Sequence, residues 1–403
     1  MSLTNTTDRY GSVSKTFHWL TALLILSLIP LGVIANDLPY DTSEELARKA
    51  WLFSLHKTLG VAVFFVALAR IGWSVTQPKP GLLHPDRKFE SLAAETVHWL
   101  LYGSLVLVPL SGWIHHAAAT GFAPIWWPLG QDLPLVPKSE GVAALFAGAH
   151  WVLTKVLAAS ILLHIAGALK HHMIDKDATL RRMWFGDALV PRTAGTHKHA
   201  TPIIAALALW ALALTGGAAL GVYAPHGNGP DAAVLEDVQT DWQVQQGSLS
   251  ITVTQLGSDV TGTFADWTAA IQFDETVPNE AEGRVAGTVD VTVSIGSLTL
   301  GSVTDQAMGP DYFNASAFPT ARFVADIVPV VDGYEAQGIL TIRDQSVPTT
   351  LPFALALEGN TASMTGRMTL NRNDFGIGAN MTDESSLKFE VGLDVSLTAT
   401  RAD

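Results

Sequence analysis

The chain has 403 residues, of which 48% are hydrophobic, with a formal net charge of −13 at pH 7 and no cysteine. The lack of cysteine excludes disulfides, thiolate-bound zinc, iron–sulfur clusters and covalently attached c-type haem, because each needs cysteine sulfur. Residues 1–230 contain 17 Lys and Arg against 13 Asp and Glu, whereas residues 231–403 contain 7 against 24. So acidic a C-terminal part predicts no nucleic-acid partner.

Five segments are apolar and long enough to cross a bilayer, which takes about 20 helical residues. They are residues 17–35, 51–73, 92–115, 142–169 and 202–223. Eleven Lys and Arg flank one side of these spans, namely Arg9, Lys15, Lys79, Arg87, Lys88, Lys170, Lys176, Arg181, Arg182, Arg192 and Lys198. Because cytoplasmic loops carry the excess of basic residues, this bias predicts a multi-pass protein with a cytoplasmic N-terminus and an external C-terminal part.

A change of composition follows the fifth span. Residues 224–239 are rich in Gly, Pro, Asn and Asp, which is typical of a linker. From residue 240 to 403 apolar residues alternate with polar ones in short segments separated by turn residues. This pattern predicts an all-β domain, an antiparallel barrel or sandwich.

Four of the thirteen histidines lie inside the predicted spans at matched depths. His150 and His164 are fourteen residues apart on the fourth span, so they lie about 21 Å apart along a helix axis. At about 100° per residue, both imidazoles point to nearly the same side of the helix. His18 matches the depth of His164, and His56 matches the depth of His150.

Histidine in hydrocarbon is costly unless it is bonded, which makes these four residues functional candidates. The alternative is that each one only hydrogen-bonds a neighbouring helix. Zinc prefers three or four ligands in one cluster, whereas two axial imidazoles at each depth suit haem b. The pattern therefore favours two haem sites over a single metal centre.

Several motifs resemble the bacterial cytochrome b561 family of four-helix, di-haem membrane cytochromes. They are Arg9-x8-His18-Trp19, His56-Lys57-x2-Gly60, His98-x3-Tyr102, Pro109-Leu-Ser-Gly-Trp113 and His150-x13-His164-x2-Gly167. The resemblance covers about residues 8–185, predicts a domain over 8–190, and leaves residues 200–223 as a fifth transmembrane helix. It implies two haem b groups, with axial pairs His18/His164 and His56/His150.

The resemblance also implies a haem-dependent oxidoreductase of a bacterial inner membrane. Electrons would pass between the quinone pool, with ubiquinone or another isoprenoid quinone, and an outer partner such as superoxide or a redox protein. Lys57 then becomes a candidate catalytic residue that pairs with a haem propionate or attracts a small anion, and the alternative is a lysine that snorkels to the interface.

Other polar residues of the spans leave alternatives open. His98, His115 and His116 are rival haem ligands by position. Arg70 and Lys155 lie deep enough to need a partner, for which a propionate or a carboxylate is expected. His171, His172, His197 and His199 belong to basic segments and are expected to be solvated.

Residues 240–403 resemble the YceI-like family of lipocalin-like barrels. The matching stretches include Val260-Thr-Gly-Thr-Phe264, Asp311-Tyr-Phe313, Ala321-Arg-Phe323, Gly338-Ile-Leu-Thr-Ile342 and Asn373-Asp-Phe-Gly-Ile377. Asp344 departs from the glycine that is usual after Arg343. The resemblance implies a periplasmic barrel that encloses an isoprenoid lipid or isoprenoid quinone. A barrel of about eight strands can hold one such ligand, and its candidate lining residues are Phe264, Phe273, Phe323, Leu340 and Phe353, which otherwise form an ordinary core.

The leading hypothesis is a membrane di-haem electron-transfer protein joined to a periplasmic isoprenoid- or quinone-binding barrel. One alternative is a membrane-anchored carrier of isoprenoids whose haem domain senses or merely anchors. Another is an electron-entry cytochrome subunit of a dehydrogenase.

Overall fold

The computed structural model describes residues 2–186, 200–224, 232–277 and 284–402, apart from residues 85, 120, 127 and 129. Arg192, Lys198, His197, His199 and part of the predicted linker lie outside these residues. The chain divides into two compact units. The membrane unit comprises Met1–Leu38, Trp51–Ala119 and Pro124–Pro225, and the barrel unit comprises Pro39–Ala50, Thr120–Ala123 and His226–Asp403.

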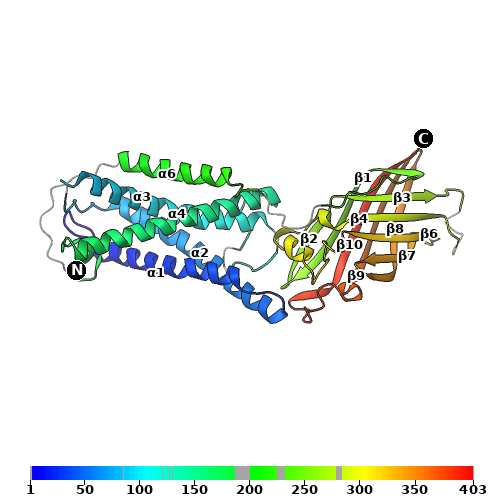
Figure 1. Ribbon diagram of the computed structural model, residues 1–403, viewed down its shortest axis with the longest axis horizontal. Helices are drawn as coiled ribbons and strands as arrows, with labels where there is room; N and C mark the ends of the chain where they lie inside the picture. The colour runs from blue at the N-terminus through cyan, green and yellow to red at the C-terminus, as the bar shows by residue number, and fades with distance from the viewer. Residues whose placement is uncertain are drawn as a thin grey trace. The chain divides into compact units, whose positions relative to one another are not determined.

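The membrane unit is helical (Figure 1). Its helices are α1 (Ser12–Asp37), α2 (Ser43–Thr76), α3 (Lys88–Ala118), α4 (Glu140–Met173), the short α5 (Thr179–Met183) and α6 (Ala200–Ala219). Within the described part of the chain, five of them are long and apolar enough to cross a membrane. They confirm the five predicted spans, although α6 ends at Ala219, before the predicted end at residue 223.

Apolar side chains from α1 to α4 form one core within the membrane unit. Its buried members are Ile25, Leu28, Val63, Ala67, Leu105 and Leu157. The fifth long helix, α6, packs against α3 and α4 (Figure 1). Gly103 makes room for it, because a Cβ at this position would lie 2.0 Å from the ring of Trp210. The four-helix core with one added helix agrees with the predicted class.

The barrel unit is a single curled antiparallel sheet (Figure 1). Its described residues form ten strands, where about eight were expected, in the order β3-β4-β6-β7-β8-β9-β10-β1-β2-β5. Their bounds are β1 (Trp242–Gln255), β2 (Ser258–Phe264), β3 (Trp267–Phe273), β4 (Gly287–Ser294), β5 (Leu298–Thr299), β6 (Thr320–Val330), β7 (Gly333–Ile342), β8 (Gln345–Glu358), β9 (Thr361–Asn371) and β10 (Leu387–Arg401). Short helices lie between some strands: η1 (Ile295–Ser297), η2 (Gly301–Val303), α7 (Thr304–Met308) and η3 (Arg372–Phe375).

The turn between β7 and β8 consists of Arg343 and Asp344. Its left-handed residue is Arg343, with φ of 58°. The guanidinium of Arg343 donates to the carbonyl oxygens of Tyr312 (3.1 Å) and Gly376 (2.9 Å), which helps to hold this unfavourable conformation. The turn therefore does not need a glycine at residue 344.

Residues 39–50 and 121–123 pack within the barrel unit. Leu46 is 1% exposed and forms a small apolar cluster with Met381 and Leu387. Phe122 packs against the same cluster. Both segments lie in the loops between the predicted spans, and periodicity alone gave no sign of this packing.

Candidate functional site

Seven histidines of the membrane-spanning helices lie in two layers. The lower layer is His18, His98 and His164, and the upper layer is His56, His115, His116 and His150. Helix α4 runs without interruption from Glu140 to Met173, so it supplies one histidine to each layer, as the spacing predicted.

In the upper layer, the two predicted ligands are held in the same way. The Nδ1 atom of His56 lies 3.1 Å from the carbonyl oxygen of Leu28, and the Nδ1 atom of His150 lies 2.8 Å from that of Val108. A carbonyl accepts, so each Nδ1 carries the proton and each Nε2 keeps its lone pair free for a metal.

Each of these imidazoles also rests against a glycine, four residues after the accepting carbonyl. A Cβ on Gly32 would lie 2.8 Å from Cε1 of His56, and a Cβ on Gly112 would lie 3.0 Å from Nδ1 of His150. Sequence reasoning did not assign a role to Gly32, and it quoted Gly112 only inside a motif. The sequence signal that could have indicated these contacts is a glycine in a neighbouring span, at the depth of a predicted ligand and one helical turn after the residue whose carbonyl accepts.

The lower layer brings three imidazoles together. The ring centroids of His18 and His164 are 6.1 Å apart with an angle of 57° between the planes, and those of His98 and His164 are 5.2 Å apart. His18 also contacts Trp19, whose indole N–H donates to the carbonyl oxygen of Met183. His98 therefore stays a rival of His18 as the partner of His164.

The other two upper histidines contact each other. His115 and His116 have ring centroids 4.4 Å apart, and Nδ1 of His115 lies 2.8 Å from the carbonyl oxygen of Ala143. His115 thus has the same kind of carbonyl partner as His56 and His150.

Three charged residues of the spans are placed as follows. Lys57 is 6% exposed, so it does not snorkel to an interface. The Arg70 guanidinium lies 5.2 Å from the ring centroid of Tyr102, and the Lys155 ammonium lies 5.1 Å from that of Trp151. Both cations thus face aromatic rings, a partner that the sequence analysis did not expect.

The donor set fits haem b. Bis-imidazole ligation needs no cysteine, and the chain has none. Two imidazoles bound to opposite sides of one iron have ring centroids about 6 Å apart, given a metal–nitrogen bond of about 2 Å. The spacing of His18 and His164 is close to this value.

The barrel unit encloses an apolar cavity of about 270 Å³. All five residues predicted to face a ligand line it, namely Phe264, Phe273, Phe323, Leu340 and Phe353. Strand register explains why some of these residues face the same side. Phe323 pairs with Leu340, and Phe353 pairs with Tyr334, across neighbouring strands. Most of the cavity wall is therefore apolar. An apolar molecule bound there would contact apolar side chains along most of its length.

Polar groups line one part of the cavity wall. Gln255, Gln306, Tyr312 and Arg372 are its polar lining residues. Gln255 is 4% exposed, and its Oε1 atom has no hydrogen-bond partner among the described residues. Burial raises the pKa of Tyr312 to about 12, so its hydroxyl stays protonated. Sequence reasoning named none of these four residues as ligand contacts.

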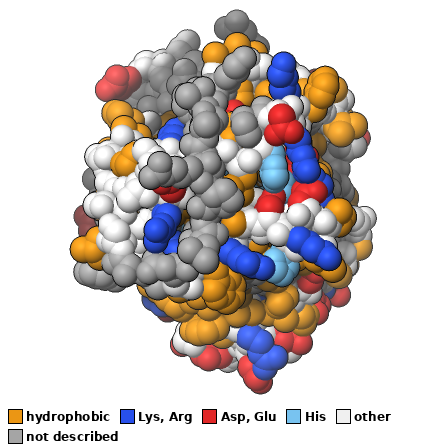
Figure 2. Space-filling model, turned by 90° about the vertical axis from the view of Figure 1, so that its left-hand side faces the viewer, with side chains coloured by type: hydrophobic (Ala, Val, Ile, Leu, Met, Phe, Trp, Pro, Cys, Tyr) orange, Lys and Arg blue, Asp and Glu red, His pale blue; other side chains and the backbone are white. Residues whose placement is uncertain are grey.

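A charged cluster lies outside the two histidine layers, on a face where Lys, Arg, Asp, Glu and His side chains gather (Figure 2). It contains His84 and His171, of which the second was expected to be solvated. That expectation is wrong, since His171 is 17% exposed and contacts three carboxylates, those of Glu90, Asp175 and Asp177.

These features define a class of protein: a helical membrane cytochrome joined to an antiparallel barrel of the ligand-binding type. The profile of the prokaryotic cytochrome b561 family matches residues 9–186, and the profile of the YceI-like domain matches residues 242–399. Cytochrome b561 homolog 2 of Escherichia coli (strain K12) is 36% identical over 187 residues, which are 45% of this chain and 95% of that protein. The chain therefore belongs to the prokaryotic cytochrome b561 family and carries a YceI-like domain after it.

Two further proteins resemble parts of the chain. The probable superoxide oxidase CybB of Yersinia pestis is 23% identical over 176 residues, which are 43% of this chain and 95% of that protein. The crystal structure of Burkholderia cenocepacia BcnA is similar over 40% of this chain and 100% of that chain, with 28% identity and a TM-score of 0.36.

Proposed function

We propose that the protein exchanges electrons between the quinone pool and an outer-side partner, while its barrel binds an isoprenoid or isoprenoid quinone. In this proposal it is an oxidoreductase of the bacterial inner membrane, with its N-terminus in the cytoplasm and its barrel in the periplasm. The eleven basic residues on one side of the predicted spans support this orientation.

The observation that carries the proposal is the way the upper histidines are held. His56 and His150 each direct Nδ1 to a carbonyl of a neighbouring helix, and each lies against a glycine. A histidine that only helps packing does not need its Nε2 atom free, whereas an axial ligand does.

We assign one haem b to His18 and His164 and the other to His56 and His150. Bound haem supplies one-electron chemistry at two depths, about 20 Å apart by the helix rise. The chain orients the imidazoles of His56 and His150 through their Nδ1 atoms, which leaves their Nε2 atoms unprotonated.

Pyridine haemochrome assays of purified variants test these pairs. Replacing either His56 or His150 with alanine should lower the haem content from two to one per chain. His172→Ala is the matched control, since His172 is an exposed histidine near the end of α4 and should leave two haems. Loss of both haems or of neither in the two variants would contradict the pairs.

Lys57 is proposed to attract a small anion such as superoxide. It follows His56 directly and is 6% exposed, so its charge acts in a medium of low dielectric constant. Lys57→Gln should slow reduction of the protein by superoxide at least tenfold, and Lys57→Arg should retain most of the rate. Equal rates in the wild type and Lys57→Gln would remove Lys57 from this role.

The apolar cavity favours a second candidate function, a membrane-anchored carrier of isoprenoids without turnover. Mass spectrometry of lipid extracted from the purified protein identifies what the barrel holds. Rapid reduction of the full-length protein by quinol or superoxide would support electron transfer, whereas bound isoprenoid without such reduction would support the carrier. A stable complex with a dehydrogenase would instead indicate an electron-entry subunit.

A further inference from the structure

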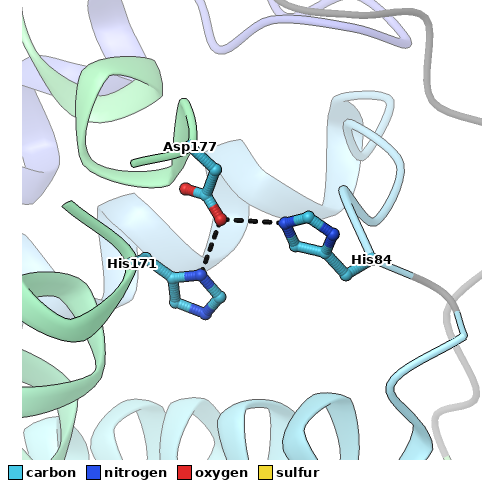
Figure 3. Close-up of side chains that lie close together, drawn as sticks. All are labelled: His84, His171 and Asp177. Carbon is cyan, nitrogen blue, oxygen red and sulfur yellow. Dashed lines mark hydrogen bonds and ion pairs between the residues drawn. The ribbon is translucent and has the colours of Figure 1, made fainter. Parts of the chain in front are cut away.

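The cluster around His171 joins two stretches that are far apart in the sequence, one at residue 84 and one at residues 171–177 (Figure 3). His84 comes from the connection between α2 and α3, His171 from the last turn of α4, and Asp177 from the connection between α4 and α5. The Oδ2 atom of Asp177 lies 2.9 Å from Nε2 of His84 and 2.7 Å from Nδ1 of His171. One carboxylate oxygen thus faces two imidazole nitrogens.

His171 has a carboxylate at each of its ring nitrogens. Its Nε2 atom lies 3.0 Å from Oε1 of Glu90, while its Nδ1 atom lies 2.7 Å from Asp177 and 3.1 Å from Asp175. A neutral imidazole has a single N–H, and ionised carboxylates only accept. One of the two sides would therefore place a lone pair near a carboxylate, an arrangement that a metal ion bound to His171 would relieve.

The charges around the cluster leave room for that cation. Arg87 lies 3.1 Å from Asp175 and 3.5 Å from Glu90, and Lys170 lies 2.8 Å and 2.5 Å from the same two carboxylates. Among the described residues, the ion-pair partners of Asp177 are the two histidines. The direct ion pairs of Arg87 and Lys170 thus involve Asp175 and Glu90, whereas Asp177 contacts the two histidines and has a longer-range attraction to Arg182.

The candidate ligand atoms already lie close together and point toward one another. A nitrogen from each of His84 and His171 and an oxygen from Asp177 lie within 4.8 Å of one another. The backbone N–H of Thr179 donates to Oδ1 of Asp177 (2.8 Å), which turns Oδ2 toward the histidines. Burial raises the pKa of the Asp177 carboxyl, but hydrogen bonds from Thr179, His171 and His84 outweigh burial and lower the pKa to about 2.

We propose that His84, His171 and Asp177 bind a divalent first-row transition metal ion. Two imidazole nitrogens and one carboxylate oxygen are a ligand set of zinc, iron(II) and related ions, which leaves a further position for water. Oε1 of Glu90 lies 3.0 Å from Nε2 of His171, so this carboxylate can take the place that a carboxylate behind a metal-bound histidine has. The ion would tie the α2–α3 connection to the end of α4 and to the α4–α5 connection.

Small movements suffice for this site to close on an ion. Ligand atoms around a tetrahedral ion lie about 3.3 Å apart for bonds of about 2 Å. The present separations of 2.7 Å and 2.9 Å are those of hydrogen bonds, so each side chain has to open by a few tenths of an ångström. The side chains of His84, His171 and Asp177 are 33%, 17% and 12% exposed, which leaves a route from water.

Zinc binding to the full-length protein tests the proposal. The protein is purified with haem bound and with a tag that lacks histidine, stripped of loosely bound metal with a chelator, and titrated with Zn²⁺ by calorimetry. We expect one saturable site per chain. His84→Ala and Asp177→Asn should each raise Kd at least tenfold, and Glu90→Gln should raise it about 10- to 100-fold.

The control is His172→Ala, which removes an exposed neighbour of His171 and should leave Kd unchanged. Haem content, measured for every variant, shows whether the membrane unit is still folded. A protein that takes up no zinc at this site, or whose Kd is the same in His84→Ala and Asp177→Asn, would overturn the proposal. The cluster would then be an ordinary network of ion pairs and hydrogen bonds.

Discussion

The Nδ1 atom of His150 lies 2.8 Å from the carbonyl oxygen of Val108, and the imidazole rests on the backbone of Gly112, one turn further along α3. His56 has the same two contacts in α1, with the carbonyl oxygen of Leu28 and the backbone of Gly32. The upper layer thus repeats one local arrangement on two helices. Contacts within the protein alone therefore fix the direction of both imidazoles.

This arrangement predicts that Gly112→Ala disturbs the upper layer. The new Cβ would lie 3.0 Å from Nδ1 of His150, which pushes the ring away from its carbonyl. Haem content should fall from two toward one per chain. Gly216→Ala in α6 is the control, because nothing lies within 4 Å of a Cβ at this position. Two full haems in Gly112→Ala would show that the contact does not matter.

The lower layer offers a choice between two histidines. The ring of His164 lies 6.1 Å from that of His18 and 5.2 Å from that of His98. We expect His18→Ala to lose one haem and His98→Ala to keep both, because the larger separation leaves room for an iron between the rings. Pyridine haemochrome assays and optical spectra of both variants decide the matter. The opposite result would make His98 the ligand.

The barrel cavity contains a testable polar group in Gln255. Its Oε1 atom is buried and lacks a partner among the described residues, which costs about 1–3 kcal/mol. Gln255→Leu should therefore stabilise the empty barrel by about 1 kcal/mol. It should also weaken binding of a ligand whose polar end donates a hydrogen bond. Thermal unfolding of lipid-free protein and the amount of lipid recovered on purification measure the two effects. A destabilised variant with full lipid content would contradict this prediction.

Arg372 is buried beside the same cavity, at 3% exposure. Its guanidinium donates to the carbonyl oxygens of Ile377, Gly378, Met381, Leu387 and Lys388. Arg372→Met should destabilise the barrel by about 3 kcal/mol or more, because several buried carbonyls lose their donors at once. Thermal or urea unfolding checks it.

Arg367→Met is a matched control for Arg372→Met. The Arg367 side chain is 81% exposed and pairs with Asp394 at the surface. Its replacement should change stability by about 0–1 kcal/mol. Equal losses in the two variants would show that the carbonyl contacts of Arg372 contribute little.

Much of the fold could be predicted because its signals are local. The spans follow from the length of apolar runs, the placement of His150 and His164 on one helix from their spacing, and the β-domain from alternation. The inward side of Phe323 and Leu340 could also be inferred, since residues that alternate along a strand face one side. Each of these inferences needs only neighbours along the chain.

Contacts between distant segments decided the rest. Nothing in the order of residues places Gly112 under His150, leaves Oε1 of Gln255 without a partner, or sets Glu90 and Asp177 on opposite sides of His171. Hydropathy and periodicity fix which side of an element is buried, but not which atom it meets. Such contacts depend on how helices and strands pack in three dimensions, so the sequence by itself determined the two domains and the histidine depths, and only the tertiary structure decided what holds each imidazole.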